Sequence, residues 1–234
     1  MLTSVMEDYL KAIYELQEAD QELVSTSEIA SRLSVKAPTV TTMTKKLAGR
    51  GLVEREAYSG VRLTDEGETV AIEVIRHHRL LEAYLVEQLG YDWAEVHEEA
   101  DVLEHHISET LEQRLAEALA DTAVDPHGAP IPSESLTIAS RSDTYLSECK
   151  EGVRLVVIEV SDRNSEQLAY LDEAGITPGT TLVVTEVAPI GLVTVQPQPD
   201  DTAVSLPMDV ARTIRVRELT DDPELAVSNA NGAA

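Results

Sequence analysis

Residues 26–47 have the sequence TSEIASRLSVKAPTVTTMTKKL, and this stretch decides the fold expected for the N-terminal part of the 234-residue chain. It predicts a short helix with a Ser or Thr cap, a tight connection at residues 34–37, and a second helix whose first turn holds Pro38. Proline suits that position because its missing N–H would have no partner there. Gly49 and Gly51 are expected to end the second helix. The pattern is typical of a helix-turn-helix.

The residues on either side extend this pattern to a winged helix-turn-helix. Upstream, apolar residues recur at helical spacing and predict a helix from about Ser4 to Ala19. Downstream, two β-rich segments at residues 52–56 and 61–64 flank a turn and predict a hairpin, which would form the wing. We therefore expect a winged helix-turn-helix over residues 1–65.

A helix-turn-helix can bind DNA because the major groove admits one helix, whose N-terminal residues reach the edges of the bases. Short hydroxyl side chains follow Pro38, and two lysines further along the same helix are placed to contact phosphates. The candidate DNA-binding residues are Ser27, Lys36, Pro38, Thr39, Thr41, Thr42, Lys45, Lys46, Arg55 and Arg62. The alternative is a solvated helix pair in a protein-interaction domain.

The charge distribution favours the DNA-binding interpretation, although the chain as a whole is strongly acidic. Its formal net charge is −25, with 43 acidic and 18 basic residues, and DNA repels such a chain. Residues 27–62 are the exception, since they hold seven basic side chains against three acidic ones. We interpret the acidity elsewhere, together with only five lysines and no phenylalanine, as the solvated surface of a protein from a halophile; an ordinary acidic protein is the alternative.

The composition argues against several other classes of protein. Hydrophobic residues make up 43% of the chain, enough for real cores, but no stretch approaches a membrane-spanning length of apolar residues. The N-terminal segment lacks the apolar region of a secretory signal. Cys149 is the only cysteine, so an internal disulfide and a cysteine zinc site are excluded. We expect a soluble, cytoplasmic protein.

The rest of the chain divides into a helical part and a β-rich part, so the expected fold is mainly α with β. Two long helices are expected, from residue 65 to 89 and from 92 to 119. Beyond a segment rich in Pro and Gly, short β-rich stretches interrupted by a helix at residues 165–173 suggest a small barrel. The expected divisions are 1–65, 66–125, a linker at 126–144, the barrel at 145–219 and a flexible tail at 220–234.

Histidines and carboxylates cluster on the two long helices, and five of the six histidines fall between residues 77 and 106. Spacings of three and four residues would place these side chains on shared helix faces. They are Asp101, Glu104 and His105 on the second helix, His97 one turn earlier, and His78 and Glu82 on the first helix.

Imidazole and carboxylate ligands without a thiolate suit Mn²⁺, Fe²⁺ or Zn²⁺. For any single histidine in this set, the alternative is a charged side chain that faces solvent. The complete set on two adjacent helices favours a metal site instead. We expect His77, His106 and His127 to be surface residues.

Several stretches of the chain resemble the diphtheria toxin repressor family of metal-dependent regulators, including its iron-dependent and manganese-dependent branches. In residues 1–135 the matching stretches are MEDYL (6–10), IASRL (29–33), APTV (37–40), GLV (51–53), LTDEG (63–67), HRLLE (78–82), VHEEAD (96–101) and DPHGAPIP (125–132). Residues 145–219 resemble the small SH3-like (FeoA-like) domain of the iron-type branch, most specifically in LDEAGITPG (171–179). The resemblance implies a helical metal-binding and dimerisation domain at 66–125.

The resemblance also implies two metal sites. The primary, activating site would comprise Asp8, Asp101, Glu104 and His105, and the ancillary site would comprise His78, Glu82 and His97, joined by Glu159 and Asp162. The iron-type branch has Met and Cys where this chain has Asp8 and Asp101, and Asp8 matches the manganese-type branch. Lys11 replaces that branch's second acid on the first helix, which argues against its paired manganese site in the same arrangement. Ligation by oxygen and imidazole alone favours Mn²⁺ over Fe²⁺.

Together these features predict a homodimeric, metal-activated transcriptional repressor of metal-uptake genes that binds double-stranded operator DNA. Neither a membrane nor a small organic substrate is expected as a partner. No nucleophile–base pair stands out, so we expect no enzymatic activity. Two alternatives are a winged-helix regulator that does not sense metal and a metallohydrolase with an appended DNA-binding-like domain.

Overall fold

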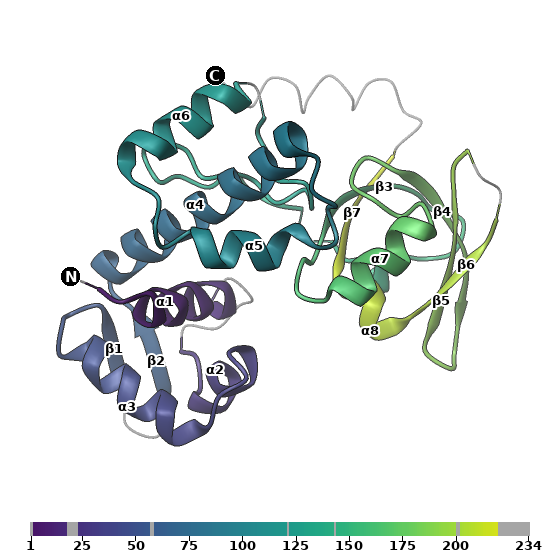
Figure 1. The fold of residues 1–234 in the computed structure, drawn as a ribbon. Coiled ribbons are helices and arrows are strands. Elements are labelled where there is room, and N and C mark those ends of the chain that lie inside the picture. Colours follow the sequence, from purple (N-terminus) through teal and green to yellow (C-terminus); the bar gives the residue numbers. More distant parts are fainter. Residues whose placement is uncertain are drawn as a thin grey trace. The chain divides into compact units, whose positions relative to one another are not determined.

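The computed structural model describes residues 2–17, 23–56, 59–120, 122–142, 144–199 and 202–219, and its fold is shown in Figure 1. The chain forms two compact units, each built from separate stretches of sequence. The first unit holds Met1–Tyr84, Glu98–Asp121 and Ile131–Ala139, and the second holds Leu85–His97, Thr122–Pro130 and Ser140–Ala234. The flexible tail expected at 220–234 lies outside the described residues.

The N-terminal part of the first unit is a winged helix-turn-helix, which confirms the prediction. Its elements are α1 (Ser4–Gln17), α2 (Thr26–Arg32), α3 (Ala37–Ala48), β1 (Val53–Glu56) and β2 (Gly60–Leu63). The Ser25 hydroxyl accepts a hydrogen bond from Glu28 N, and the Glu28 carboxylate accepts one from Ser25 N, so a capping box starts α2. The end of the expected first helix, at residues 18–19, lies outside the described residues.

One hydrophobic core holds these elements together. Leu10 and Ile13 of α1, Ile29 of α2, and Val40 and Leu47 of α3 are fully buried in it. Each such aliphatic side chain stabilises the fold by about 1.5–3 kcal/mol relative to an exposed position. Because the apolar face of α3 points into this core, its opposite face is left to solvent.

Helix α4 (Asp65–Leu89) starts directly after the wing, at a close approach between Gly67 and the backbone of Leu52. The Thr64 hydroxyl accepts a hydrogen bond from Gly67 N (3.1 Å) and donates one to Gly51 O (2.7 Å). A Cβ atom on Gly67 would lie only 1.9 Å from Leu52 O. Glycine is therefore required for the start of α4 to pack against this loop.

Replacing Gly67 with alanine should lower the free energy of unfolding by about 3 kcal/mol, the upper end of typical overpacking costs. A backbone carbonyl cannot move aside by changing rotamer, so the helix start itself would have to shift. Urea denaturation of the Gly67→Ala and Gly49→Ala variants would measure the effect. Gly49 has an ordinary right-handed conformation, and its Cβ would come no closer than 3.4 Å to a neighbour. Equal stabilities for the two variants would contradict this explanation.

The single helix expected from residue 92 to 119 is wrong, because two helices occupy that stretch. Helix α5 spans Val96–Leu103 and helix α6 spans Glu109–Leu119. The Ser108 hydroxyl caps α6 by accepting a hydrogen bond from Leu111 N (3.3 Å), so the sequence starts a new helix there. One cluster of buried hydrophobic residues in this helical part comprises Leu80, Leu81, Ala83, Ala100, Leu115 and Leu119. They form a core shared by α4, α5 and α6.

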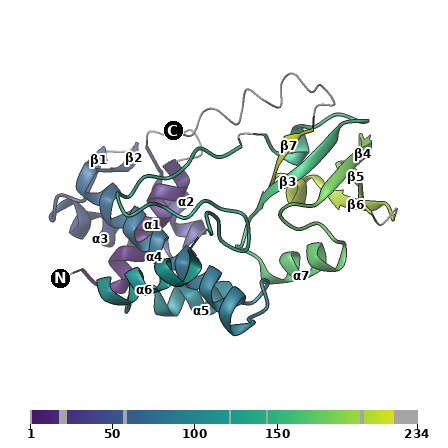
Figure 2. The ribbon, with the colours of Figure 1, turned by 90° about the horizontal axis from the view of Figure 1, so that it is seen from above.

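The second unit contains a five-stranded antiparallel sheet with strand order β6-β5-β4-β3-β7, which confirms the small β domain expected near the C-terminus. The strands are β3 (Arg154–Val160), β4 (Thr181–Ala188), β5 (Leu192–Pro197), β6 (Val204–Pro207) and β7 (Ile214–Glu218). The helices are η1 (Leu146–Glu148), α7 (Ser165–Glu173) and α8 (Met208–Ala211). Figure 2 shows α7 beside the strands, and Leu168 and Leu171 are its buried contribution to the core. The sequence did not predict β6, which has only four residues and ends in a proline.

Residues before the expected linker and within it also belong to the second unit. Trp93 and Ala94 pack against the core of the sheet. The backbone carbonyl of His127 accepts a hydrogen bond from Val160 N (2.9 Å), which ties this segment to β3. The packing of the sheet therefore includes residues far outside 145–219, and the five-part division by residue number stays a prediction.

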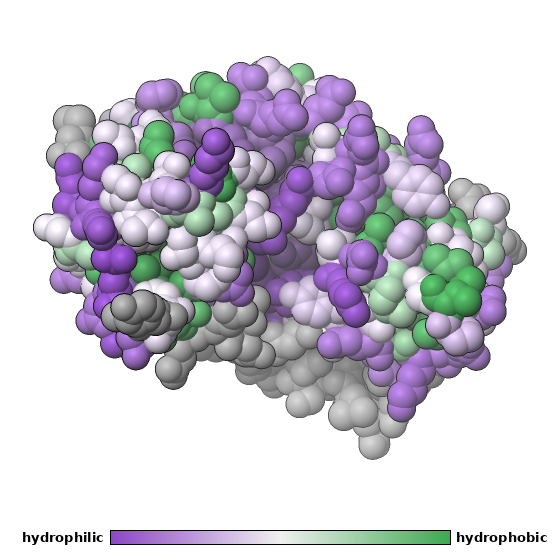
Figure 3. Space-filling model, turned by 90° about the horizontal axis from the view of Figure 1, so that it is seen from below, coloured by the Kyte–Doolittle hydropathy of each residue, from purple (hydrophilic) through white to green (hydrophobic). Residues whose placement is uncertain are grey.

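The helices and the surface of the described residues can be compared with those of membrane-spanning proteins. Across the described ranges, no helix is both long and apolar enough to cross a membrane. Figure 3 shows one face of the molecule, on which hydrophilic side chains predominate and hydrophobic ones are scattered. Scattered single hydrophobic residues are ordinary on a protein surface.

Candidate metal centre and nucleic-acid interface

The solvent-facing side of α3 and the wing expose most of the residues that the sequence selected for DNA binding. The exposed ones are Ser27, Lys36, Pro38, Thr39, Thr42, Lys45, Lys46, Arg55 and Arg62, and Thr41 is half-buried. Thr41 and Thr42 donate their hydroxyl hydrogen bonds to carbonyls one turn earlier in α3. Of the three threonines that follow Pro38 closely, only Thr39 makes no such bond within the described ranges. Its hydroxyl is therefore the one most open to a partner.

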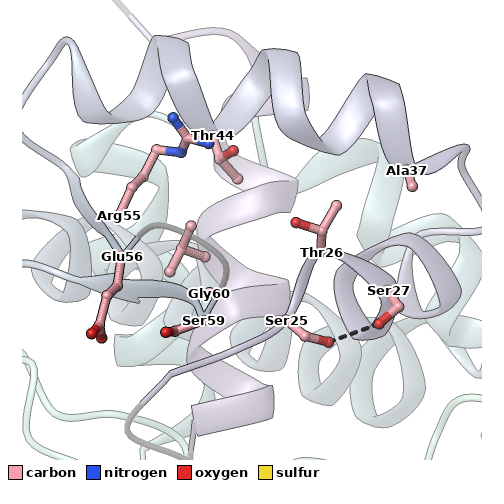
Figure 4. Close-up of a pocket in the computed structure, with 10 residues that line it drawn as sticks. Ser25, Thr26, Ser27, Ala37, Thr44, Arg55, Glu56, Ser59 and Gly60 are labelled. Carbon is pink, nitrogen blue, oxygen red and sulfur yellow. Dashed lines mark hydrogen bonds between the residues drawn. The ribbon is translucent and has the colours of Figure 1, made fainter.

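A groove of about 530 Å³ lies between the start of α2, helix α3 and the wing (Figure 4). Its lining residues are Ser25, Thr26, Ser27, Ala37, Thr44, Arg55, Glu56, Ser59, Gly60 and Val61. The Arg55 side chain extends along the groove toward Thr44, and the Ser25 and Ser27 hydroxyls lie 2.9 Å apart. Hydroxyls together with one arginine suit the oxygens of a phosphate backbone. Ser25 and Ser59 were not predicted from the sequence, because a loop hydroxyl carries no periodic signal.

The basic side chains at this surface differ in how much of their charge is already paired. Arg62 Nε donates a hydrogen bond to Glu54 Oε2 (2.7 Å) across the wing, and both side chains are exposed. Such an exposed ion pair contributes about 0–1 kcal/mol, so a phosphate can compete with the carboxylate for Arg62. In the part of the chain that the structure describes, Lys45, Lys46 and Arg55 form no ion pair.

Three of the four residues predicted for the primary metal site meet in the first unit. Asp8 lies on α1, and Glu104 and His105 lie in the turn that follows α5. His105 Nε2 is 2.8 Å from Asp8 Oδ1 and 3.5 Å from Glu104 Oε1, and one ligand atom from each residue lies within 4.8 Å of the others. Two carboxylates and an imidazole form a donor set that fits Mn²⁺ or Fe²⁺.

Glu7 is a further residue of this centre, and the sequence analysis missed it. Its Oε2 atom lies 2.7 Å from His105 Nδ1, on the other side of the imidazole from Asp8. A carboxylate at Nδ1 places the ring proton there and leaves the lone pair of Nε2 for a cation. Glu7 directly precedes Asp8, but no spacing rule links it to a histidine 98 residues away.

The break after α5 corrects the geometry expected for the primary site. Asp101, Glu104 and His105 do not share a face of one helix, because α5 ends at Leu103. Asp101 instead lies with His78, its Oδ1 atom 3.3 Å from His78 Nδ1. His78, Asp101 and Glu104 thus form a second group of possible ligands, with one ligand atom from each within 4.8 Å of the others.

Glu104 connects the two groups, and Lys11 lies in the second one. Glu104 Oε1 is near His105, whereas Glu104 Oε2 accepts a hydrogen bond from Lys11 Nζ (2.8 Å) and lies 2.5 Å from His78 Nδ1. Lys11 Nζ also donates to Asp101 Oδ1 (3.1 Å) and lies 3.0 Å from His78 Nδ1. The Lys11 residue is 8% exposed and Glu104 is 2% exposed. A buried ammonium therefore sits beside the buried carboxylate of Glu104 and the buried imidazole of His78, and the Asp101 side chain that it also contacts is 50% exposed.

The electrostatics of these residues follow from burial and from their partners. Burial raises the pKa of the Asp8 carboxyl above its usual value, although His105 opposes this shift. Burial would also raise the pKa of Glu104, but the hydrogen bond with His78 and the charge of Lys11 outweigh it and lower that pKa. Burial would lower the pKa of His78, but Glu82 and the bonds to both glutamates raise it to about 10. Because its pKa is raised, Asp8 holds a proton more tightly than an exposed carboxylate does. A cation that binds Asp8 therefore faces stronger competition from that proton.

Within each unit, two of the residues predicted for the ancillary site lie beside each other. In the first unit, His78 Nε2 is 2.9 Å from Glu82 Oε1. In the second unit, His97 Nδ1 is 3.4 Å from Asp162 Oδ2. The Glu159 carboxylate faces arginines, with Oε2 3.4 Å from Arg141 Nε and 3.8 Å from Arg215 Nε. The grouping of His78, Glu82, His97, Glu159 and Asp162 into one site stays a prediction.

Two of the three histidines expected at the surface are not exposed. His127 is 1% exposed, because its ring packs on Trp93 and its Nε2 atom lies 2.7 Å from Trp93 O. His77 is half-buried and lies 3.3 Å from Glu112 of α6. Only His106 is exposed as expected. Both errors arise because tertiary neighbours, not local spacing, cover these rings.

A winged helix-turn-helix with an exposed basic face, together with a carboxylate–imidazole centre, defines a metal-responsive DNA-binding regulator. Comparison with known proteins places the chain more closely. Residues 1–61 match the family model described as iron dependent repressor, N-terminal DNA binding domain. Residues 64–133 match iron dependent repressor, metal binding and dimerisation domain, and residues 144–218 match the FeoA domain.

Relatives match the chain over nearly its whole length. The iron-dependent repressor IdeR of Mycobacterium leprae is 31% identical, over 93% of this chain and 99% of the relative. The diphtheria toxin repressor of Corynebacterium diphtheriae is 32% identical with the same coverage. The chain therefore belongs to the iron-dependent repressor family that includes the diphtheria toxin repressor. This family consists of transcriptional repressors and not of enzymes, which sets the metallohydrolase alternative aside.

Solved structures of similar proteins support the same fold. A manganese-dependent transcriptional repressor in complex with manganese is 38% identical, with a TM-score of 0.85 over 92% of this chain and 100% of that chain. ScaR with bound Zn²⁺ is 33% identical, with a TM-score of 0.80 over 92% of this chain and 99% of that chain. Both similarities extend through the DNA-binding, helical and C-terminal parts.

Proposed function

We propose that this protein is a metal-activated repressor that binds operator DNA as a homodimer in the cytoplasm and controls genes of metal-ion uptake. The observation that carries the proposal is the meeting of Asp8 with Glu104 and His105. Asp8 belongs to α1, which shares a core with the helix-turn-helix, whereas Glu104 and His105 follow α5. The centre thus joins the DNA-binding part to the helical part of the first unit.

Activation would follow from how these residues respond to a cation. A bound Mn²⁺ or Fe²⁺ would supply the positive charge that offsets the repulsion between the Asp8 and Glu104 carboxylates. Glu7 orients the imidazole of His105, and α1 is thereby held against the turn after α5. Metal binding shifts the protein toward its DNA-binding arrangement only to the extent that this arrangement binds the cation more tightly than the other arrangement does.

Mn²⁺ is favoured over Fe²⁺ as the physiological activator. The described donors of the centre are carboxylate oxygens and an imidazole nitrogen, without a thiolate or thioether, and hard donors of this kind suit Mn²⁺. The similarity to a manganese-dependent repressor structure supports the same choice.

Dimerisation is proposed to involve the helical region at 66–125. Val102 of α5 and Leu111 of α6 are large hydrophobic residues that are 63% and 44% exposed. The match to a metal-binding and dimerisation domain covers both residues. A dimer would place two recognition helices on half-sites spaced by one or more helical turns of DNA.

Operator binding measured with Mn²⁺, Fe²⁺, Zn²⁺ and excess chelator tests the proposal. Affinity should rise by at least about 10-fold with the activating metal and fall back with chelator, a coupling typical of allosteric sites. Equal affinity with and without every metal would instead support a winged-helix regulator that does not sense metal.

Replacing Glu7 with alanine should weaken Mn²⁺ binding by about 10–100-fold, the usual cost of removing a carboxylate that orients a ligating histidine. The conservative Glu7→Gln variant keeps a hydrogen-bond acceptor for His105 Nδ1 and should lose less. Titration with Mn²⁺ would compare both variants with Glu98→Gln, a change at an exposed position of α5. A Glu7→Ala variant with unchanged affinity would exclude an orienting role.

A further inference from the structure

Lys11 is placed where a second cation of this centre would lie. It follows Asp8 by one turn on α1, and its Nζ atom contacts all three members of the second ligand group. The distances are 2.8 Å to Glu104 Oε2, 3.0 Å to His78 Nδ1 and 3.1 Å to Asp101 Oδ1. The two carboxylate distances are those of charged hydrogen bonds, and the ammonium, which also lies close to His78 Nδ1, fills the space between the three ligand atoms.

Glu104 contacts Lys11 and also belongs to the group with Asp8 and His105. Its Oε2 atom faces the ammonium, and its Oε1 atom faces His105. The two oxygens of one carboxylate therefore serve two neighbouring cation positions. One of these positions is taken by a side chain of the protein, and the other is the group of Asp8, Glu104 and His105.

We infer that the Lys11 ammonium acts as a tethered cation in place of a second divalent ion, so that this centre binds a single metal ion through Asp8, Glu104 and His105. The inference rests on the proposed function only in taking that group as the activating site. A divalent ion between His78, Asp101 and Glu104 would have to displace the ammonium from all three of its partners. Lys11 thus sets the number of ions that the centre accepts.

The charge of Lys11 supports this role. Burial alone would lower the pKa of the ammonium, but the carboxylates of Glu104 and Asp101 outweigh burial and hold the pKa above its usual value. The side chain therefore stays positively charged in its buried position. It also holds α1 to Glu104 and Asp101 without any metal, so part of the centre is assembled before an ion binds.

Electron paramagnetic resonance and calorimetry with Mn²⁺ alone test the inference on the intact chain. Two Mn²⁺ ions bridged by Glu104 would be magnetically coupled, whereas one ion in this centre gives an uncoupled signal. The unaltered protein should stay uncoupled up to saturation, and Asp8→Asn should bind one Mn²⁺ fewer per chain. A coupled signal from the unaltered protein would overturn the inference, as would no loss of an ion in Asp8→Asn.

Substitution of Lys11 gives a second, independent test of the inference. Lys11→Glu replaces the cation by a ligand and should bind one additional Mn²⁺ per chain with a coupled signal. The matched control Lys150→Glu makes the same charge change at an exposed position of the second unit and should behave like the unaltered protein. A Lys11→Glu variant that folds but binds no additional ion contradicts the inference.

Lys11→Gln covers the case in which the glutamate variant does not fold. Loss of the ammonium should lower its melting temperature in chelator, and saturating Mn²⁺ should raise that temperature by more than in the unaltered protein. An equal rise would count against the inference. Operator binding is read separately: if one uncoupled Mn²⁺ binds without improving DNA affinity, the proposed function fails while the role of Lys11 stands.

Discussion

Replacing Glu104 with glutamine should abolish the response of DNA binding to Mn²⁺. Glu104 contributes one oxygen to the group with Asp8 and His105 and the other to Lys11 and His78. The substitution exchanges an anionic oxygen ligand for a neutral amide, so metal affinity should fall by more than the roughly 100-fold that marks the upper range for an outer orienting residue. Glutamine keeps the volume of the buried side chain, whereas alanine would leave a cavity as well.

Operator binding across an Mn²⁺ titration would measure this loss, with circular dichroism and sedimentation to check folding and assembly. Glu99→Gln is the matched control, because Glu99 is exposed on α5 and lies in none of the possible ligand groups among the described residues. It should respond to Mn²⁺ like the unaltered protein. If Glu104→Gln also responds normally, the activating site has been placed on the wrong residues.

Replacing Lys45 and Lys46 together with alanine should cost about 10³-fold in DNA affinity at 0.1 M salt, for operator and scrambled DNA alike. Both side chains are exposed in the C-terminal half of α3, where phosphates are the expected partners. Each lost phosphate contact lowers the salt slope by about 0.9, and a dimer would lose four contacts. The loss should shrink steeply as salt rises.

A salt series with both DNAs would test this prediction, and Thr39→Val provides the contrast. Thr39 is exposed near the start of α3 and should affect base preference more than salt slope. Lys150→Ala, at an exposed position of the second unit, should leave both properties unchanged. The orientation of α3 in the groove would be wrong if the lysine variant changed the preferred sequence while Thr39→Val did not.

Local signals explain why the winged helix-turn-helix could be predicted from the sequence. The start of α3 is marked by Pro38, and the antiparallel pairing of β1 with β2 follows from a short connection between them. Both signals depend on residues that are close together in the sequence, so the order of the elements can be predicted directly. The family resemblance was likewise visible in short stretches. Helical spacing selected Glu104 and His105, and the family resemblance added Asp8; the structure brings these three residues together.

The interior of the metal centre could not be predicted in the same way. The family resemblance indicated that Lys11 replaces an acid, but not that its ammonium lies between residues 67, 90 and 93 positions away. Helical periodicity also extended one helix through the turn at His105, because no strong breaker such as Pro or Gly marks residues 104–108. Contacts of this range depend on how α1, α4 and α5 pack, and no spacing rule encodes that packing.

The packing of Trp93 and Ala94 on the C-terminal sheet has a practical consequence for dissecting the protein. Ala94 is 5% exposed and belongs to the same core as Leu155 and Val216, and Val160 N is bonded to the carbonyl of His127. A fragment cut at the start of the FeoA match would expose that part of its core and leave Val160 N without this partner. A recombinant fragment that starts there would therefore aggregate more readily than the intact chain. If it failed to fold, the cause would be the absence of Trp93 and Ala94 from its core, and not an intrinsic instability of the sheet.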